Sequence, residues 1–338
     1  MKSLRYSTVI AATIALTSAM SLQAQTTTPQ RRVLMEEYTG TWCSNCPRGI
    51  ASIEHLQKKY GDRFIAVAIH QDSYDPMKTK LYASGNGYPS CQLNRSINCD
   101  PFFGTDWDYS DPIGVIHDID KLMKQTCYAD VSATAQWKDN THTSIEVTAT
   151  AVFTDTQQAS YYRWAFVVTE DHVTAPDPND RYWKQQNKYV GDTDWLVMPE
   201  MATFVNGSSL MAIEYNHVVV DGSGIRQGIE NSVSDPVVAQ QPNTFTYTID
   251  ISENTLIQDV SNLSVVAILL NTRYKDVENA AITAISTPDD GATAVSQVKG
   301  DDVMKQHDVY NLQGQKMNNK NTRRGIVIID GKKVAAPI

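Results

Sequence analysis

Cysteine is absent from most of this 338-residue sequence. The five cysteines lie at positions 43, 46, 91, 99 and 127, and the long remainder of the chain has none. Any chemistry that depends on thiols is therefore restricted to the first part of the chain. Because five is an odd number, at least one cysteine has no partner within the chain.

Basic clusters are also scarce. The sequence has 38 acidic and 29 basic residues and a net charge of −9, and no basic cluster stands out before Arg323–Arg324 and Lys332–Lys333. This charge balance disfavours nucleic acid and an anionic membrane surface as partners. We therefore expect a protein that binds neither.

Long hydrophobic runs are missing after residue 24, so no transmembrane helix is expected in the mature chain. The apolar run at residues 8–22 follows Lys2 and Arg5, is too short to span a bilayer and leads into small residues. This pattern predicts a signal peptide over residues 1–24. No cysteine precedes Cys43, so lipidation of an N-terminal cysteine is not expected. An exported chain enters an oxidising compartment, where thiols form disulfides or are used.

The first folded part is predicted to be α/β. Residues 33–38 and the apolar run at 64–70 predict buried strands, the second of a kind found in parallel sheets. Between them, Ile50, Ile53 and Leu56 recur at helical spacing before Gly61. Strand, helix and strand in this order form a βαβ unit.

The pattern changes near residue 130, after which short β-rich runs alternate with polar turns. These runs predict an antiparallel β-sandwich over residues 131–286. Residues 287–300 are rich in Pro, Gly, Asp and Ser and predict a linker. Residues 301–338 predict a small β module with a hairpin at Asp330–Gly331.

Cys43 and Cys46 form a Cys-x-x-Cys motif at the predicted start of a helix. There the helix dipole and free backbone N–H groups favour a thiolate at the first cysteine. Cys43 is thus the candidate nucleophile, and Cys46 is the candidate resolving thiol that attacks a mixed disulfide. Zinc would require a second pair of ligands, which Cys91 and Cys99 do not provide. We expect neither a metal nor a cofactor.

The run Trp42–Cys43–Ser44–Asn45–Cys46, between a strand and a helix, resembles the active-site motif of the thioredoxin superfamily. The resemblance implies a thioredoxin-like domain over residues 32–130. It also implies that Glu37 accepts a proton from Cys46, and that Pro89 of Tyr88–Pro89–Ser90 forms a cis peptide facing the cysteines. The dipeptide Ser44–Asn45 departs from the Gly-Pro of thioredoxin, so the redox potential and the direction of electron flow stay undefined.

A longer match, residues 36–47, is similar to the signature of a bacterial family named for a twenty-eight-kilodalton outer-membrane protein. That resemblance implies a thioredoxin-like domain followed by an Ig-like sandwich, in exported proteins of Gram-negative bacteria. The tail from about residue 309 resembles the C-terminal sorting modules of type nine secretion substrates. A plain terminal hairpin is the alternative for this tail.

The sequence leaves the placement of Cys91 and of His70 open. Cys91 and Cys99 form a disulfide across a hairpin, or else Cys91, two residues past Pro89, lies near the Cys43–Cys46 pair as an extra thiol. We favour the bridge, which leaves Cys127 free. His70 ends a strand beside the motif, where it either stabilises the Cys43 thiolate or is a hydrogen-bonded strand-end histidine; we favour the latter.

Two functions are consistent with the sequence. The first is a thiol–disulfide oxidoreductase whose partners are the thiols and disulfides of exported proteins and an unidentified redox donor. The second is a non-enzymatic binding protein of the cell surface or outer membrane. In it the thioredoxin-like fold serves a function other than redox catalysis, and the Cys43–Cys46 disulfide is static. Both functions place the protein outside the inner membrane, at the cell surface, secreted or in the periplasm.

Overall fold

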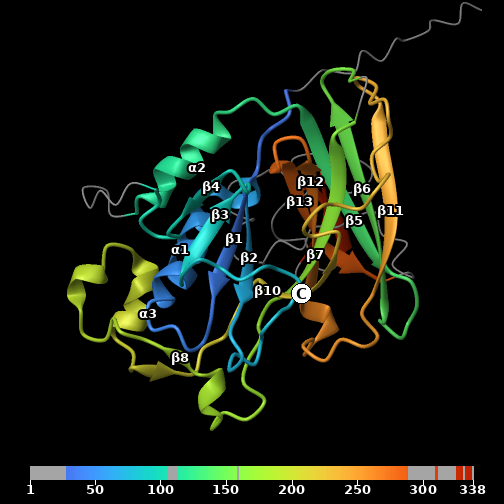
Figure 1. Cartoon of the computed structure of the whole chain (residues 1–338). Coiled ribbons are helices and arrows are strands. Elements are labelled where there is room, and N and C mark those ends of the chain that lie inside the picture. The colour runs from blue at the N-terminus through green and yellow to red at the C-terminus, as the bar shows by residue number, and fades with distance from the viewer. Residues whose placement is uncertain are drawn as a thin grey trace, which may run out of the picture.

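The computed structural model describes residues 28–105, 113–157 and 160–287, together with strands at 309–310, 325–329 and 332–336 (Figure 1). The predicted signal peptide (1–24) and nearly all of the predicted linker (287–300) lie outside the described residues. The described part is rich in β-structure and contains few helices.

One mixed sheet of eleven strands forms the centre of the fold, in the order β11-β6-β5-β13-β12-β7-β10-β2-β1-β3-β4. The strands are β1 Val33–Thr39, β2 Phe64–His70, β3 Ser90–Leu93, β4 Ile97–Cys99, β5 Ala129–Trp137, β6 Ser144–Phe153, β7 Tyr162–Glu170, β10 Val218–Ser223, β11 Pro242–Asp250, β12 Leu263–Asn271 and β13 Asp276–Ser286.

The predicted strand–helix–strand unit is present at one end of this sheet. β1 and β2 pair in parallel from Val33↔Phe64 to Thr39↔His70, and every residue of both strands is buried. The helix between them, α1 (Pro47–Tyr60), begins with a proline, which loses no hydrogen bond in the first turn. It ends at Gly61, whose φ of +56° suits a residue without a Cβ. A short 3₁₀ turn, η1 (Gly61–Arg63), leads into β2.

The runs predicted after residue 130 do form strands, but these strands join the sheet of the first part. β10 pairs in parallel with β2 through Val218↔Ala68 and antiparallel with β7. The predicted boundary between residues 130 and 131 lies inside β5. β7 and β12 are almost fully buried along their length, as expected for central strands covered on both faces.

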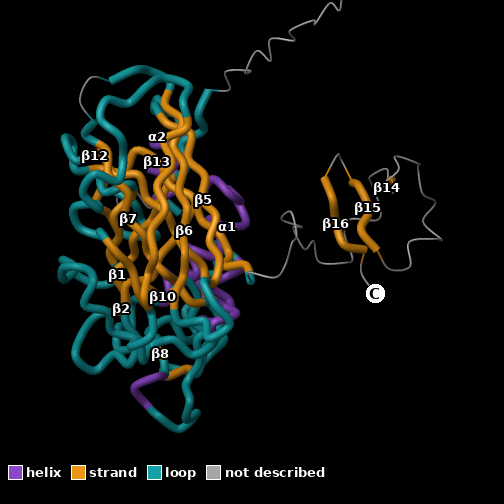
Figure 2. Tube along the Cα trace, turned by 90° about the vertical axis from the view of Figure 1, so that its right-hand side faces the viewer, coloured by secondary structure: helices purple, strands orange, loops and turns teal. Residues whose placement is uncertain are grey.

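Three apolar clusters hold the layers together. The first lies between β1 and β2 and the helices α1 and α2 (Val115–Met123), and includes Met35, Leu56, Ala66 and Ile119. The second unites β5 and β6 with β7 and β12, through residues such as Phe153, Trp164, Phe166 and Leu269. The third joins residues of both parts of the chain: Leu34, Ile65, Val67, Val167, Val266 and Ile268. Figure 2 shows these strands together in one body.

Residues 171–217, between β7 and β10, form an irregular insertion that lies beside α1 and contains β8 and α3 (Figure 1). Four of its side chains, Tyr189, Met198, Met201 and Phe204, pack into the cluster around α1 and α2. Glu200 also accepts a hydrogen bond from Lys58 of α1 at 2.9 Å. Its elements are η2 Arg181–Trp183, β8 Gln185–Gln186, η3 Thr193–Trp195, η4 Pro199–Met201, α3 Ala202–Val205 and β9 Leu210–Met211. A further turn, η5 (Val260–Asn262), precedes β12.

Near the C-terminus, β14 (Val309–Tyr310), β15 (Gly325–Ile329) and β16 (Lys332–Ala336) form a separate antiparallel sheet. β15 and β16 flank the predicted Asp330–Gly331 hairpin. Among the described residues, no helix has the length and apolar character needed to cross a membrane.

Candidate thiol–disulfide site

Cys43 and Cys46 are joined by a disulfide in the loop between β1 and α1. The backbone closes two successive turns here, because Cys43 N donates to Gly40 O and Cys46 N donates to Cys43 O, both at 3.1 Å. Pro47 then starts α1 directly. The motif therefore occupies the helix start that the sequence predicts.

The disulfide is not open to solvent. Cys43 is 5% exposed and Cys46 is fully buried. Residues 185–189 of the insertion, here called the cover, lie against the motif loop and donate hydrogen bonds to its carbonyl groups. The bonds are Gln186 N to Thr41 O (2.7 Å), Gln185 Nε2 to Cys43 O (2.9 Å), Lys188 N to Ser44 O (3.2 Å) and Tyr189 Oη to Asn45 O (3.1 Å). This cover was not predicted from the sequence.

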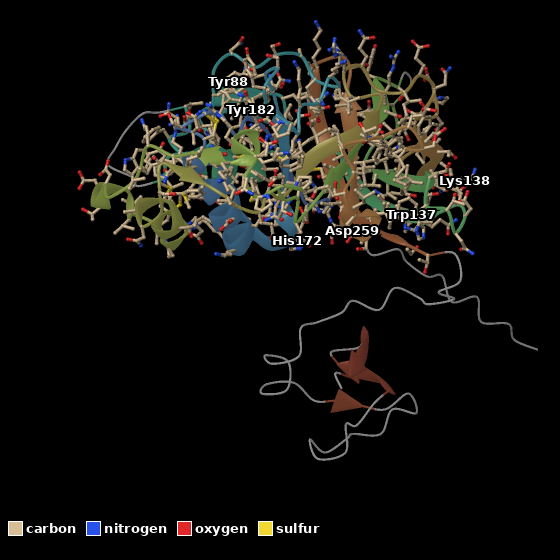
Figure 3. All side chains as sticks on the ribbon, turned by 90° about the horizontal axis from the view of Figure 1, so that it is seen from below. Tyr88, Trp137, Lys138, His172, Tyr182 and Asp259 are labelled. Atoms are coloured by element: carbon tan, nitrogen blue, oxygen red, sulfur yellow. A yellow bond between two sulfur atoms is a disulfide. The ribbon has the colours of Figure 1, made fainter. Side chains whose placement is uncertain are left out.

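Trp42 connects the motif to the loop that contains Tyr88 and Pro89, here called the proline loop. The Tyr88–Pro89 peptide bond is cis. The ring of Tyr88 packs edge-on against Trp42 with centroids 5.1 Å apart, and Trp42 Nε1 donates to Gln71 O at 2.9 Å. Tyr88 and Tyr182 of the insertion are labelled near each other in the view of Figure 3, and Tyr182 stacks on Tyr74 with ring centroids 6.2 Å apart. The proline loop and the insertion therefore both approach the motif.

Glu37 is buried on β1, below the first turn of α1. A Cβ added to Gly49 would lie 1.9 Å from Glu37 Oε1. The carboxyl group therefore fits here because position 49 is a glycine. Burial raises the pKa of Glu37 from its usual 4.5 to about 8, with a further contribution from Asp100, while Arg48 opposes the shift. Glu37 Oε1 has no hydrogen-bond partner among the described residues. A carboxyl group in this state is able to accept or release a proton near neutral pH.

A cavity of about 60 Å³ adjoins Glu37 and is also lined by Thr39, His70 and His217. It is large enough to hold water. Thr39 Oγ1, like Glu37 Oε1, lacks a hydrogen-bond partner within the described part of the chain. A water molecule in the cavity could form hydrogen bonds with both of these atoms.

Arg48 and Asp100 form a buried ion pair beside the motif. The Arg48 guanidinium donates to Asp100 through Nε and Nη2. Its Nη1 also donates to Tyr189 Oη at 3.2 Å, so the pair extends to the insertion. Nothing in the sequence indicated this pairing, because the two residues are far apart in the chain and no periodic pattern relates them.

His70 is held by Asp75 at 3.0 Å from Nδ1 to Oδ2, and both side chains are buried. Asp75 Oδ2 also accepts a hydrogen bond from Thr41 N at 2.9 Å. The favoured interpretation of a hydrogen-bonded strand-end histidine agrees with this geometry. Through Asp75, His70 fixes the loop that carries the cysteines.

The other three cysteines are thiols in this structure. Cys91 and Cys99 lie directly opposite each other on β3 and β4, with their Sγ atoms 3.4 Å apart, so the bridge expected between them is not formed here and stays a prediction. Cys127 is buried and donates to Ala129 O at 3.3 Å, and burial raises its pKa to about 11. Within the described ranges, no three His, Cys, Asp or Glu side chains gather in a way that could hold a metal ion.

Comparison with known proteins gives structural likenesses at low identity. No protein-family model matches the chain, and no curated protein matches it. Among solved structures, HBP35 of Porphyromonas gingivalis is 15% identical with a TM-score of 0.51, over 91% of this chain and 99% of that one. A shared fold follows from this likeness. A protein from Agrobacterium tumefaciens is 14% identical over 76% of this chain and 96% of that one, with a TM-score of 0.38. A domain of the outer membrane lipoprotein Omp28 from P. gingivalis is also 14% identical, over 48% of this chain and 90% of that one, with a TM-score of 0.24.

Proposed function

We propose that the chain is an exported cell-envelope protein that acts by binding, and that its Cys43–Cys46 disulfide is structural. The observation that carries this proposal is the cover over the motif. An exchange-active disulfide must present a sulfur atom to an attacking thiolate along the S–S axis. Here Cys43 is 5% exposed, and residues 185–189 bond to the loop around it.

We also propose a fold for each of the two parts of the chain. The parallel β1–α1–β2 unit, the disulfide before α1 and the cis Tyr88–Pro89 peptide support a thioredoxin-like first part. The packing of β5 and β6 on β7 and β12 supports an Ig-like sandwich. Together with the signature at residues 36–47, this architecture supports membership of the family named for the twenty-eight-kilodalton outer-membrane protein.

The proposed localisation outside the inner membrane is supported by the signal-peptide pattern of residues 1–24. It is also supported by the disulfide, since disulfides persist in oxidising compartments. The tail is proposed to direct the protein to the cell surface. Deletion of residues 301–338 tests this: the truncated chain is expected to stay in the periplasm with its disulfide intact. Equal export of both chains would reduce the tail to an accessory hairpin.

Thiol–disulfide exchange is the second candidate, and Glu37 favours it. A buried carboxyl group with a pKa of about 8 beside the motif suits a proton acceptor for Cys46. In that function Cys43 attacks, Cys46 resolves and Trp42 and Pro89 shape the partner site. The partners are thiols and disulfides of exported proteins, and the redox donor is unidentified.

One experiment separates the two candidates. The purified mature chain is equilibrated in glutathione buffers of increasing reducing power, treated with iodoacetamide and mapped by mass spectrometry, and insulin reduction is assayed in parallel. A structural disulfide leaves Cys43 unlabelled until strongly reducing conditions and gives no insulin turnover. Rapid labelling of Cys43 together with insulin turnover would replace the binding proposal by the exchange function.

A further inference from the structure

The β3–β4 hairpin brings two thiols into contact outside the Cys43–Cys46 disulfide. Cys91 pairs directly with Cys99 in the antiparallel register, so both side chains lie on the same face of the hairpin. Their Sγ atoms are 3.4 Å apart. Directly opposite positions have Cβ atoms close to the separation that a disulfide requires, so a bond between them needs only small side-chain movements.

The two thiols line a pocket of about 520 Å³. Cys91 is 2% exposed, whereas Cys99 is only partly buried. A reagent that enters this pocket therefore meets Cys99 first. The pocket wall also includes Gly85, Pro89, Ser90, Gln92 and Asn98.

We propose that Cys91 and Cys99 are a redox-convertible thiol pair, which reacts through Cys99 with disulfides that enter this pocket. The pair is independent of the proposed binding function, because neither cysteine belongs to the Cys43–Cys46 motif. It gives the protein a second thiol site, in which Cys99 is partly exposed, while Cys43 and Cys46 are buried.

The reaction has two steps. The Cys99 thiolate attacks one sulfur of an external disulfide R–S–S–R, whose S–S bond breaks; one RS⁻ leaves and takes up a proton, and a Cys99–S–S–R mixed disulfide remains. Cys91 then gives up its proton, and its sulfur attacks Cys99 Sγ, which releases the second RS⁻ as a thiol. Two protein thiols become one disulfide, and the external disulfide gains the two electrons and two protons as two thiols.

The surroundings divide these roles between the two cysteines. Burial raises the pKa of Cys91 well above its usual value, and Cys99, Glu37 and Asp100 contribute in the same direction. Cys91 therefore remains a protonated thiol until a mixed disulfide forms beside it. A buried thiol 3.4 Å from the reacting sulfur is well placed to resolve that intermediate and poorly placed to start the reaction.

The test uses the whole mature chain and oxidised glutathione as the probe. The chain is first brought to the state with Cys91 and Cys99 reduced, then exposed to increasing ratios of oxidised to reduced glutathione, quenched with acid and alkylated. Because Arg95 lies between the two cysteines, trypsin leaves them on separate peptides that stay linked only if the bridge has formed. Cys43 and Cys46 have no Lys or Arg between them and are followed separately.

We expect reversible linkage of the Cys91 and Cys99 peptides in the wild-type chain and in the control Cys127→Ser. In Cys91→Ser, Cys99 accumulates bound glutathione. In Cys99→Ser, linkage is lost, and Cys91 takes up glutathione at less than about a tenth of that rate because it is buried. A second arm with insulin as the disulfide separates the sources: linkage by both probes identifies disulfides in general as partners, and linkage by glutathione alone identifies small ones.

Two results would overturn the proposal. One is that both cysteines of the wild-type chain stay thiols at every glutathione ratio, or stay bridged at every ratio. The other is that Cys91 in Cys99→Ser and Cys99 in Cys91→Ser react with glutathione at equal rates. That result would show that Cys99 is not the preferred first nucleophile. If a variant fails to fold, the relative iodoacetamide labelling rates of Cys99 and Cys91 in the reduced wild-type chain decide the order.

Discussion

Gln185 Nε2 donates a hydrogen bond to the carbonyl oxygen of Cys43 at 2.9 Å, and so attaches the insertion after β7 to the disulfide loop before α1. The same Nε2 also bonds Gly40 O and Gln186 O. Gln185 is completely buried, although it lies more than 140 residues from the motif in the chain. This one side chain therefore couples the two parts of the protein at its candidate site.

Replacement of this side chain is expected to uncover the disulfide. Gln185→Ala removes the donor of these bonds, so dithiothreitol should reduce Cys43–Cys46 several-fold faster, and the free energy of unfolding should fall by about 1–3 kcal/mol. The measurements are the rate of Cys43 alkylation during reduction and a denaturant titration. Gln186→Ala is the matched control, because Gln186 is exposed and bonds Thr41 through its backbone N–H. Equal reduction rates in both variants would show that Gln185 does not hold the cover.

Glu37 is expected to make stability depend on pH. Its pKa is about 8 in the folded protein and about 4.5 when unfolded, so the folded state binds more protons between these values. Stability should therefore fall as the pH rises from about 4.5 to about 8. Glu37→Gln should flatten this profile and, above pH 8, exceed the wild type by on the order of a few kcal/mol.

The comparison requires denaturant titrations across that pH range. Glu253→Gln, which changes an exposed carboxylate, should keep the wild-type profile. If Glu37→Gln also kept it, the carboxyl group would have to be ionised at the same pH in the folded and unfolded states. That outcome would remove Glu37 as a proton acceptor in the exchange function.

Gly49 should show the reverse of the usual glycine effect in a helix. Alanine normally stabilises a helix interior by about 1 kcal/mol relative to glycine. Here the new Cβ would lie 1.9 Å from Glu37 Oε1 and 3.2 Å from Pro101 Cγ, so Gly49→Ala should destabilise the protein by about 1–3 kcal/mol. In a Glu37→Ala background the main obstacle is gone, and the same change should cost much less. If Gly49→Ala lowered the free energy of unfolding equally in both backgrounds, the Glu37 carboxyl group would not be the reason that position 49 requires glycine.

The sequence predicted the local elements of the site but not their surroundings. Pro47, the spacing of Ile50, Ile53 and Leu56, and Gly61 define α1 through interactions within a few residues, so its limits could be read directly. The cover by residues 185–189 depends on hydrogen bonds to backbone carbonyls, which are the same for any sequence. No pattern of residue types could reveal it.

The shared sheet was missed for a related physical reason. The apolar run of β2 showed that both of its faces are buried, but not which strand lies beside it. Its neighbours are β1, which follows the predicted βαβ order, and β10, which comes from the region predicted as a separate sandwich. Main-chain pairing between distant strands is set by the topology of the whole chain, and burial patterns constrain it only weakly.

The two parts are expected to unfold together, because the apolar cluster around Ile268 contains residues of both. Ile268 of β12 is fully buried in one cluster with Leu34 of β1 and Ile65 of β2. Ile268→Ala should lower the free energy of unfolding by about 2–5 kcal/mol. It should reduce the hydrogen-exchange protection of the slowest amides in β1 and β2 as much as in β12, since one cooperative unit loses stability as a whole. The control is Ile282→Ala, on the neighbouring strand β13, where the side chain is 45% exposed. It should change neither the free energy of unfolding nor the hydrogen-exchange protection. Loss of protection in β12 with unchanged protection in β1 and β2 would show instead that the sheet separates between β10 and β2, where Val218↔Ala68 is the one registered pair.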